Sequence, residues 1–347
     1  MFVLDAGEAQ DILRKQSNSG ASLQAGSESE DADLIALVSY AQRLAHVAIS
    51  GFRVGAVARG ESGRIYLGVN VELPGLPLNA CVHAEQTLIT NLLIHREPSV
   101  QAVYISAAPC GHCRQFLSEL VCAESMTICF GKDMHAHKLA DILPERFGPH
   151  SLLEKGQDIS LLLQPQHHDV SLMRPIDASS SAQSAVEHIV FAAAADKAIQ
   201  AARTSYTPYY RCPAAAAIIF TPTTGDSPPE EASGLTHQIT ASAPQASESL
   251  DADSGWVQKQ DHEIAAGPCM ESAAHNPGML PLQSAIVAGI LTGRLTSFDQ
   301  IVGAVLVECN DTPVQSAKLE AAPSIHMDAS VPPAPLSTPT IPSPIPI

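Results

Sequence analysis

The sequence predicts an α/β protein in which helices are layered on a sheet, and in which one such unit occurs twice. Short apolar runs typical of strands alternate with segments whose apolar residues recur at helical spacing, which is the pattern of layered α/β domains. The order helix, strand, strand, helix, strand appears in both halves of the chain. The length of 347 residues is sufficient for two domains with cores of their own.

The first domain is expected over residues 31–150. Residues 1–30 are rich in Ser, Gly and Glu, and we expect them to be flexible after a short helical turn. Further along, Gly60-Glu-Ser-Gly63 joins two apolar runs and predicts a hairpin. The expected elements are a helix from residue 33, strands over 54–59 and 65–69, a helix over 84–94, a strand over 103–106, a helix over 111–120 and a strand over 126–130.

The second domain is expected over residues 185–318, after a polar, Ser-rich linker over 151–184. Residues 221–262 are rich in Pro, Ser, Glu and Asp and are predicted to be a disordered insertion. Residues 319–347 form a Pro-rich tail that is predicted to be disordered, either as a spacer or as a docking ligand. The expected elements are a helix over 185–203, strands over 214–220 and 263–267, a helix over 281–291 and a strand over 302–307.

Composition excludes several classes of function. The net charge is −17 at pH 7, and phosphate backbones require a basic surface, so we expect no nucleic-acid partner. No apolar run is long enough for a bilayer and no secretory signal is evident, so we expect no membrane association and a cytoplasmic protein. The eight cysteines belong to a chain too long for the disulfide-stapled class. Those beside apolar residues, which we expect to be buried thiols, are Cys122, Cys129, Cys212, Cys269 and Cys309.

The clearest chemical signal is a candidate zinc site made by His83, Cys110 and Cys113. Zinc readily takes imidazole and thiolate ligands, and three protein ligands leave the fourth position for water, as in catalytic sites. The two cysteines lie three residues apart, so a helix start places both sulfurs on one face and favours the thiolates. Glu85 lies two residues beyond His83, and His-x-Glu followed by Pro-Cys-x-x-Cys is the signature of zinc-dependent base deaminases.

Other interpretations of these residues remain open in the sequence alone. The two cysteines are also compatible with a redox pair, and Cys81 is a candidate fourth ligand that would close a structural zinc site. Spacing argues against closure, because residues two apart on a helix point to different faces. Glu85 is the expected catalytic residue; the alternative is a carboxylate that only stabilises the start of a helix.

The motifs taken together resemble those of the cytidine deaminase family, in the long, two-domain, homodimeric type of bacteria and plants. The resemblance covers about residues 31–318. It is carried by Gly51-Phe-Arg-Val-Gly-Ala-Val-Ala-Arg-Gly, Gly68-Val-Asn-Val-Glu72, His83-Ala-Glu-Gln, Pro109-Cys-Gly-His-Cys-Arg-Gln and Leu143-Pro-Glu-Arg-Phe-Gly-Pro149, and in the second domain by Glu271-Ser-Ala-Ala-His-Asn-Pro and Leu280-Pro-Leu-Gln. It implies a three-layer α-β-α fold and one Zn²⁺ per chain. It also implies hydrolysis of cytidine and deoxycytidine to uridine, deoxyuridine and ammonia.

The same resemblance implies a set of substrate contacts. It assigns Asn70 and Glu72 to the ribose hydroxyls and Phe52 to the base, although Phe52 is also compatible with a plain core position. It assigns the backbone around Ala84 and Ala108 to the edge of the base. Glu72, as a carboxylate, should repel phosphate and favour nucleosides over nucleotides.

The second domain is interpreted as a degenerate copy that has lost the metal ligands, although a chance likeness of two α/β units is the alternative. Its counterpart of His83 is expected to be Pro281 or Leu282, and Pro313 to Ala317 stand where the first domain has its cysteines. The resemblance implies that this copy closes the site of the partner chain in a homodimer through Glu271 and His275. His275 replaces the aromatic ring usual in related sequences, and its alternative is a surface residue.

Two other functions compete with cytidine deamination. One is deamination of cytosine in nucleotides or polynucleotides, against which the acidic charge and Glu72 count. The other is an inactive interaction protein with structural zinc, against which the intact ligand set and Glu85 count.

Overall fold

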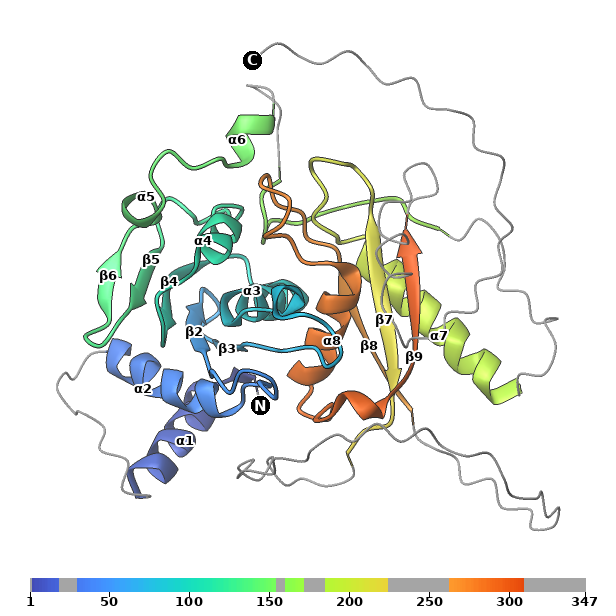
Figure 1. The fold of residues 1–347 in the computed structure, drawn as a ribbon, viewed down its shortest axis with the longest axis horizontal. Coiled ribbons are helices and arrows are strands. Elements are labelled where there is room, and N and C mark those ends of the chain that lie inside the picture. Colours follow the sequence, from blue (N-terminus) through green and yellow to red (C-terminus); the bar gives the residue numbers. More distant parts are fainter. Residues whose placement is uncertain (1, 19–29, 154–159, 172–184, 224–261, 309–347) are drawn as a thin grey trace.

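The computed structural model describes residues 2–18, 30–153, 160–171, 185–223 and 262–308. We call residues 2–153 the first half and residues 185–308 the second half. The predicted tail lies outside the described residues, as does the predicted insertion except for residues 221–223 and 262. Each described half is a sheet covered by helices, which confirms the α/β class (Figure 1).

The first half contains a mixed sheet of six strands in the order β1-β3-β2-β4-β5-β6. Neighbouring strands are antiparallel except β4 and β5, which run parallel. The strands are β1 (Val3–Leu4), β2 (Gly55–Gly60), β3 (Ile65–Val69), β4 (Val100–Ile105), β5 (Thr127–Phe130) and β6 (His135–His137).

Two glycines show that α2 (Glu30–Arg43) and α3 (Ala84–Ile94) cover opposite faces of this sheet. A Cβ on Gly55 would lie 2.6 Å from the Val38 carbonyl oxygen in α2, and one on Gly68 would lie 2.2 Å from the Ala84 carbonyl oxygen in α3. Gly55 pairs with Val69, the neighbour of Gly68, and adjacent strand residues point to opposite faces. The helices therefore approach the sheet closely from both sides, which is the three-layer arrangement.

Within the residues that the structure describes, the second half repeats this arrangement with fewer strands. Its sheet has the order β8-β7-β9, and all its pairs are antiparallel. Figure 1 shows α8 on one face, toward the first half, and α7 on the other. The elements are α7 (Ala185–Ala202), β7 (Ala214–Phe220), β8 (Glu263–Pro268), α8 (Pro281–Leu291) and β9 (Ile301–Glu308).

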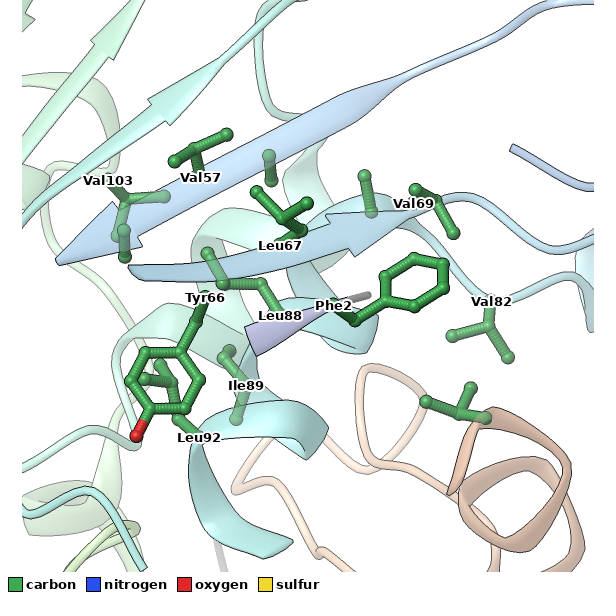
Figure 2. Close-up of a cluster of buried hydrophobic side chains, with 14 of the residues drawn as sticks. Phe2, Val57, Tyr66, Leu67, Val69, Val82, Leu88, Ile89, Leu92 and Val103 are labelled. Atoms are coloured by element: carbon green, nitrogen blue, oxygen red, sulfur yellow. The ribbon is translucent and has the colours of Figure 1, made fainter. Parts of the chain in front are cut away.

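The two halves join where α3 packs against α8. Figure 2 shows buried side chains on both faces of this sheet: Val57 and Leu67 lie on the face toward α2, and Tyr66 lies on the face toward α3, with Leu88 and Leu92 of that helix. The same continuous cluster includes Ile286 and Ile290 of α8. Burial of apolar surface at this joint stabilises the halves as one body.

Several expected elements are confirmed to the residue. The observed bounds of β3, α3, β7 and α8 are those predicted, and β2, β4, β5, α7, β8 and β9 differ by at most three residues at an end. The helix that was predicted to reach Leu120 ends earlier, as α4 (Gly111–Leu117). Short helices that the sequence did not predict are η1 (Leu78–Ala80), α5 (Leu139–Ile142), α6 (Pro149–Leu152) and η2 (Phe298–Gln300).

The N-terminal segment differs from its prediction. Residues 2–18 contain more regular structure than the expected helical turn: Val3 and Leu4 pair with β3 as β1, and α1 (Ala6–Asn18) follows. Phe2 is 3% exposed, and its carbonyl accepts a bond from the Asn91 side-chain amide at 2.8 Å.

The polar linker also differs from its prediction, because Leu162 is fully buried and forms a strand bridge with Leu120. In both places, tertiary contacts order a segment whose local sequence carries no strong signal.

Isolated strand bridges align the two halves residue by residue. His46 bridges to Val71, which bridges to Val82; Tyr206, Met270 and Met279 repeat this chain of bridges. The residue after Val82 is His83, the N-cap of α3, and the residue after Met279 is Leu280, the N-cap of α8. The counterpart of His83 is therefore Leu280, and the expectation of Pro281 or Leu282 was wrong.

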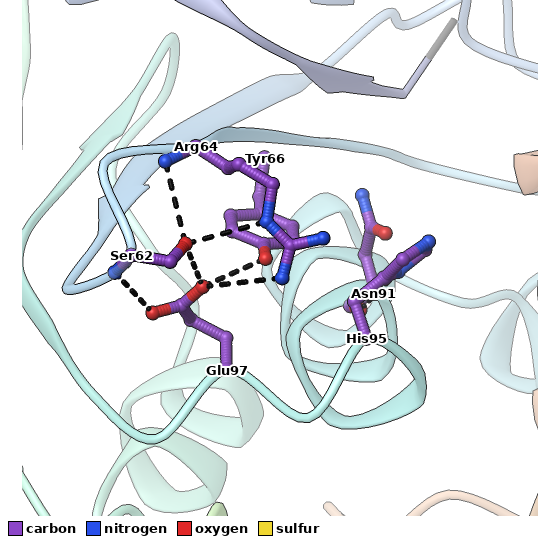
Figure 3. Close-up of polar contacts among 6 residues, drawn as sticks. All are labelled: Ser62, Arg64, Tyr66, Asn91, His95 and Glu97. Carbon is purple, nitrogen blue, oxygen red and sulfur yellow. Dashed lines mark hydrogen bonds and ion pairs between the residues drawn. The ribbon is translucent and has the colours of Figure 1, made fainter.

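A buried carboxylate, Glu97, closes the hairpin of β2 and β3 (Figure 3). It accepts bonds from the Ser62 amide at 2.9 Å, the Ser62 hydroxyl at 2.5 Å and the Tyr66 hydroxyl at 2.7 Å, and the Arg64 guanidinium lies 3.9 Å away. Burial opposes ionisation, but these bonds and the guanidinium outweigh it and hold the pKa of Glu97 below its usual value. The Tyr66 hydroxyl responds in the opposite sense: burial, then the bond to Glu97, raises the pKa of Tyr66 to about 12.

We expect Glu97→Gln to lower the free energy of unfolding by about 1–3 kcal/mol at pH 7, because buried donors lose a charged acceptor. The lowered pKa of Glu97 in the folded state means that its ionisation stabilises the fold above the unfolded-state pKa, near 4.5. That contribution is lost as the pH falls through the folded-state pKa. The difference in free energy of unfolding between wild type and Glu97→Gln should therefore shrink as the pH falls. Denaturant unfolding at pH 7, 5 and 4 measures this, with the exposed Glu61→Gln as control. A difference that is constant with pH would contradict the role of the charge.

Candidate metal centre

The three predicted zinc ligands lie together at the starts of two helices. His83 is the N-cap of α3, Cys110 is the N-cap of α4, and Cys113 lies in the first turn of α4. His83 Nδ1 is 3.4 Å from the Cys110 sulfur and 3.3 Å from the Cys113 sulfur, and the two sulfurs are 3.6 Å apart. Within the described ranges, no other group of His, Cys, Asp or Glu has the spacing of a metal site.

These distances fit a tetrahedral zinc ion. Bonds of ~2.3 Å to sulfur and ~2.0–2.1 Å to nitrogen at tetrahedral angles place two sulfurs about 3.8 Å apart, and nitrogen and sulfur about 3.5 Å apart. The observed spacings of 3.6, 3.4 and 3.3 Å are close to these values. One imidazole and two sulfurs also make a donor set that zinc prefers. The three groups therefore have the spacing and chemistry of a three-ligand zinc site, and no fourth His, Cys, Asp or Glu among the described residues belongs to the group.

The alternatives left open by the sequence are not supported. Cys81 is not part of the ligand group, so it does not close the site as a fourth ligand. Cys110 and Cys113 are separate thiols rather than a disulfide. His112, between them, is exposed and does not belong to the ligand group.

The two sulfurs differ in their affinity for a proton. The contact with the Cys113 sulfur, then that with His83, lowers the pKa of Cys110 to about 3. The same contact with Cys110, then burial, raises the pKa of Cys113. Zinc binds cysteine as the thiolate, so metal binding at this group would displace any proton from both sulfurs.

Glu85 occupies a setting unlike that of an ordinary helix-start carboxylate. It lies in the first turn of α3 and is 4% exposed, so water does not solvate its charge. Burial raises its pKa, while its own amide and the Cys113 thiol act in the opposite direction. A buried carboxyl group with a raised pKa, beside a metal site, is suited to carry protons.

Phe52 and Asn70 meet in the turn before β2. Phe52 is 64% exposed, so it is not a core residue. The Asn70 side chain spans this turn: its oxygen accepts from the Val54 amide at 2.8 Å, and its nitrogen donates to the Phe52 carbonyl at 2.8 Å. Asn70 therefore fixes the backbone that presents the Phe52 ring.

Glu72 holds the neighbouring loop. Its carboxylate is 4% exposed and accepts from the Ile49 amide at 2.7 Å, the Ser50 amide at 3.0 Å and the Ser50 hydroxyl. Burial opposes ionisation of Glu72, but these bonds outweigh it and lower its pKa, so the group is a carboxylate at neutral pH. Ala84, the residue after His83, is fully buried, and Ala108 is exposed in the segment that leads from β4 to Cys110.

Glu271 is the counterpart of Glu72 in the second half. It accepts from the Tyr209 amide at 2.8 Å and the Tyr210 amide at 3.1 Å, which repeats the bonds of Glu72 to two successive amides. His275 has a positive φ of 63° and its ring bonds the Tyr210 hydroxyl at 2.8 Å. Neither Glu271 nor His275 belongs to the ligand group of this chain.

Sequence reasoning missed two groups that support the site. The Gln86 side-chain oxygen accepts from the His83 amide at 2.9 Å, and the Arg114 guanidinium donates to the Pro109 carbonyl at 2.7 Å. The signal for Gln86 is present in the sequence, because the third position of a helix that starts after His83 is a capping-box position. His168 is half-buried, and its ring bonds the Ser205 carbonyl at 2.8 Å.

The fold and the site define a zinc-dependent hydrolytic enzyme. The family model of the cytidine and deoxycytidylate deaminase zinc-binding region matches residues 28–131, and a second model of that description matches residues 139–224 and 242–320. Cytidine deaminase 1 of Arabidopsis thaliana is 35% identical over 81% of this chain and 82% of that protein. Cytidine deaminase of Vibrio cholerae serotype O1 (strain M66-2) is 32% identical over 80% of this chain and 74% of that protein. The chain belongs to the cytidine and deoxycytidylate deaminase family.

A solved structure of cytidine deaminase from Mycobacterium tuberculosis aligns with a TM-score of 0.31 and 28% identity, over 35% of this chain and 99% of that chain.

Among the residues that the structure describes, no helix combines the length and the apolar character needed to cross a bilayer.

Proposed function

We propose that this protein hydrolyses cytidine and deoxycytidine to uridine and deoxyuridine, with release of ammonia. The observation that carries the proposal is the buried carboxyl group of Glu85 in the helix turn that follows the zinc ligand His83. Relatives named cytidine deaminase, which match about four fifths of the chain, support this substrate.

His83, Cys110 and Cys113 would hold the zinc ion, which supplies, when bound, a water molecule whose pKa falls to ~7. Glu85 would accept a proton from water and donate it to ring nitrogen N3, which makes C4 of the base electrophilic. Glu85 would then carry a second proton to the departing amino group. One water molecule is consumed, the C4–N bond breaks and a C4–O bond forms. The buried setting of Glu85 keeps bulk water from competing for these protons.

Recognition of the nucleoside is proposed to follow the assignments made from the sequence. The exposed Phe52 ring would contact the base, and the backbone at Ala84 and Ala108 would bind its edge. Asn70 and Glu72 would bind the ribose hydroxyls while they hold the surrounding loop. Because Glu72 is ionised, a phosphate near the ribose would be repelled, which favours nucleosides over nucleotides.

The direct test is the loss of cytidine ultraviolet absorbance on addition of purified, zinc-loaded protein. Cytidine, deoxycytidine, cytidine monophosphate and single-stranded DNA are compared at equal cytosine concentration. We expect turnover of the two nucleosides and little or none of the other two. Faster turnover of the monophosphate or the DNA would replace this proposal with a nucleotide or polynucleotide deaminase, and no turnover of any would favour a protein with structural zinc.

We expect Glu72→Gln to lower kcat/KM for cytidine. We also expect it to reduce the preference of the enzyme for cytidine over cytidine monophosphate. The variant removes the charge but keeps the shape of the side chain, so repulsion of phosphate weakens most. Kinetics of both substrates on wild type, Glu72→Gln and the exposed Glu61→Gln measure the effect. An unchanged ratio between the substrates would place Glu72 away from the sugar.

We further propose a homodimer in which Glu271 and His275 act on the partner's site, and a cytoplasmic location. The exposed Tyr210 ring, 50% exposed and paired with His275, supports a contact surface at this tip. The free thiols of Cys122 and Cys129 support a reducing compartment. Mixing Glu85→Ala chains with His275→Ala chains tests the dimer: recovery of activity in mixed dimers supports a shared site, and a fully active monomer on dilution contradicts it.

A further inference from the structure

A fully buried carboxylate of the first half accepts side-chain hydrogen bonds from the second half. Glu119, two residues beyond α4, is 0% exposed. It accepts bonds from four donors: the hydroxyls of Tyr206 at 2.8 Å and Tyr209 at 2.5 Å, the hydroxyl of Ser272 at 3.2 Å and the amide of Ala273 at 2.8 Å. All four donors belong to the second half. The segment that carries Cys113 is thereby tied to the loop of residues 271–277.

The far end of the 271–277 loop is tied to the other ligand segment. The Gln86 side chain donates to the Pro277 carbonyl at 2.9 Å, while its oxygen accepts from the His83 amide at 2.9 Å. One buried amide group therefore connects the backbone of a zinc ligand with the second half. Both ligand segments, which lie far apart in the sequence, contact the same short loop.

A reciprocal bond repeats this contact from the opposite side. The Gln283 side chain donates to the Ala80 carbonyl at 3.0 Å, and its oxygen accepts from the Leu280 amide at 3.0 Å. Since Val82 is aligned with Met279, Ala80 is aligned with Pro277, and Gln86 with Gln283. The two glutamine contacts are thus equivalent across the joint of α3 and α8, and one of them holds the chain three residues before His83.

We propose that the metal-free second half is a brace that fixes the spacing of the two zinc-ligand segments in its own chain. Glu119, Gln86 and Gln283 are its positioning residues, and the 271–277 loop is the part that spans between the segments. A zinc site tolerates only small errors in ligand placement, and groups that orient ligands contribute strongly to affinity. The brace acts on the zinc centre, so it stands independently of which nucleoside is the substrate.

The test measures zinc retention rather than turnover. Full-length, zinc-loaded protein is mixed with excess 4-(2-pyridylazo)resorcinol well below its unfolding temperature, and the coloured zinc complex reports release. Gln283→Ala leaves every residue of the metal-bearing half unchanged, and we expect it to release zinc about 10-fold faster than wild type, in the range found for groups that orient metal ligands. We expect Glu119→Gln to act in the same direction. The control is Glu124→Gln, a carboxylate 72% exposed in the same segment, which should release zinc as wild type does.

Thermal unfolding with and without zinc separates a brace from a general loss of stability. A ligand that binds only the folded state raises Tm, and at a fixed ligand concentration the rise grows with the logarithm of its affinity. A brace variant should lose part of this zinc-dependent rise, whereas an equal fall of Tm in both forms, or release from Gln283→Ala at the wild-type rate, overturns the proposal. Should Glu119→Gln yield no folded protein, Ser272→Ala, which removes a single bond to Glu119, takes its place and is judged by the same two outcomes.

Discussion

Glu85→Ala is expected to lower kcat for cytidine by about 10²–10⁴-fold, the usual contribution of general acid–base catalysis, while it keeps one zinc ion per chain. The expected loss follows from the position of Glu85, because the described part of the chain places no other carboxylate in the ligand-bearing turn of α3. The removed side chain is not a metal ligand, so zinc content should stay near that of wild type. Single-turnover kinetics and metal analysis on the same sample measure both quantities.

Glu85→Gln and the exposed Glu61→Ala are the matched controls for this result. Glu85→Gln keeps the volume of the side chain but cannot carry a proton as a carboxyl group does. Its kcat for cytidine should therefore fall nearly as far as that of Glu85→Ala. Glu61→Ala should behave as wild type. Near-normal turnover in Glu85→Ala would remove Glu85 from the mechanism, and loss of zinc in that variant would point instead to a role in building the site.

Cys110→Ser is expected to abolish activity through the metal. A hydroxyl is a poor replacement for a thiolate ligand of zinc, and loss of a direct ligand should weaken zinc binding by more than the ~10–100-fold found for groups that only orient ligands. Zinc per chain after dialysis against a weak chelator, and turnover before and after addition of zinc, measure the effect.

Cys81→Ser is the matched control, because Cys81 is the cysteine nearest in sequence to His83 and lies outside the ligand group. It should retain zinc and turnover. If Cys81→Ser lost zinc as Cys110→Ser does, the centre would have four protein ligands and a structural role. If Cys110→Ser kept both zinc and turnover, the ligand assignment would be wrong.

The metal centre was predictable from the sequence because its ligands lie in short local motifs. A histidine and two cysteines at helix starts, with Glu85 nearby, carry their chemistry in their spacing. Helix α3 and strand β3 were predictable for a similar reason: the first has an apolar helical run and the second a run bounded by turn residues.

What the sequence did not reveal depends on contacts between distant residues. Strand β1 forms because β3 offers an edge for pairing, and nothing in Val3–Leu4 alone predicts it. The bond of Glu119 with Ser272 joins residues 153 positions apart, and no local pattern marks it. The counterpart of His83 was misplaced because the segment between the bridged residues is shorter in the second half, 270 to 279 against 71 to 82.

The hairpin of β7 and β8 bears on how well this chain tolerates inserted sequence. Phe220 and Glu263, the last pair of the ladder, face each other across the two strands, so the chain leaves the sheet and returns to it at neighbouring points. In the first half the corresponding strands β2 and β3 are joined by a short turn at Ser62. Extra residues between paired strand ends leave the register of the ladder unchanged, and the entropy of closing a loop grows only slowly with its length. This end of the second sheet is therefore a natural acceptor for inserted sequence, and a site where a whole foreign domain can be grafted while both strands keep their partners.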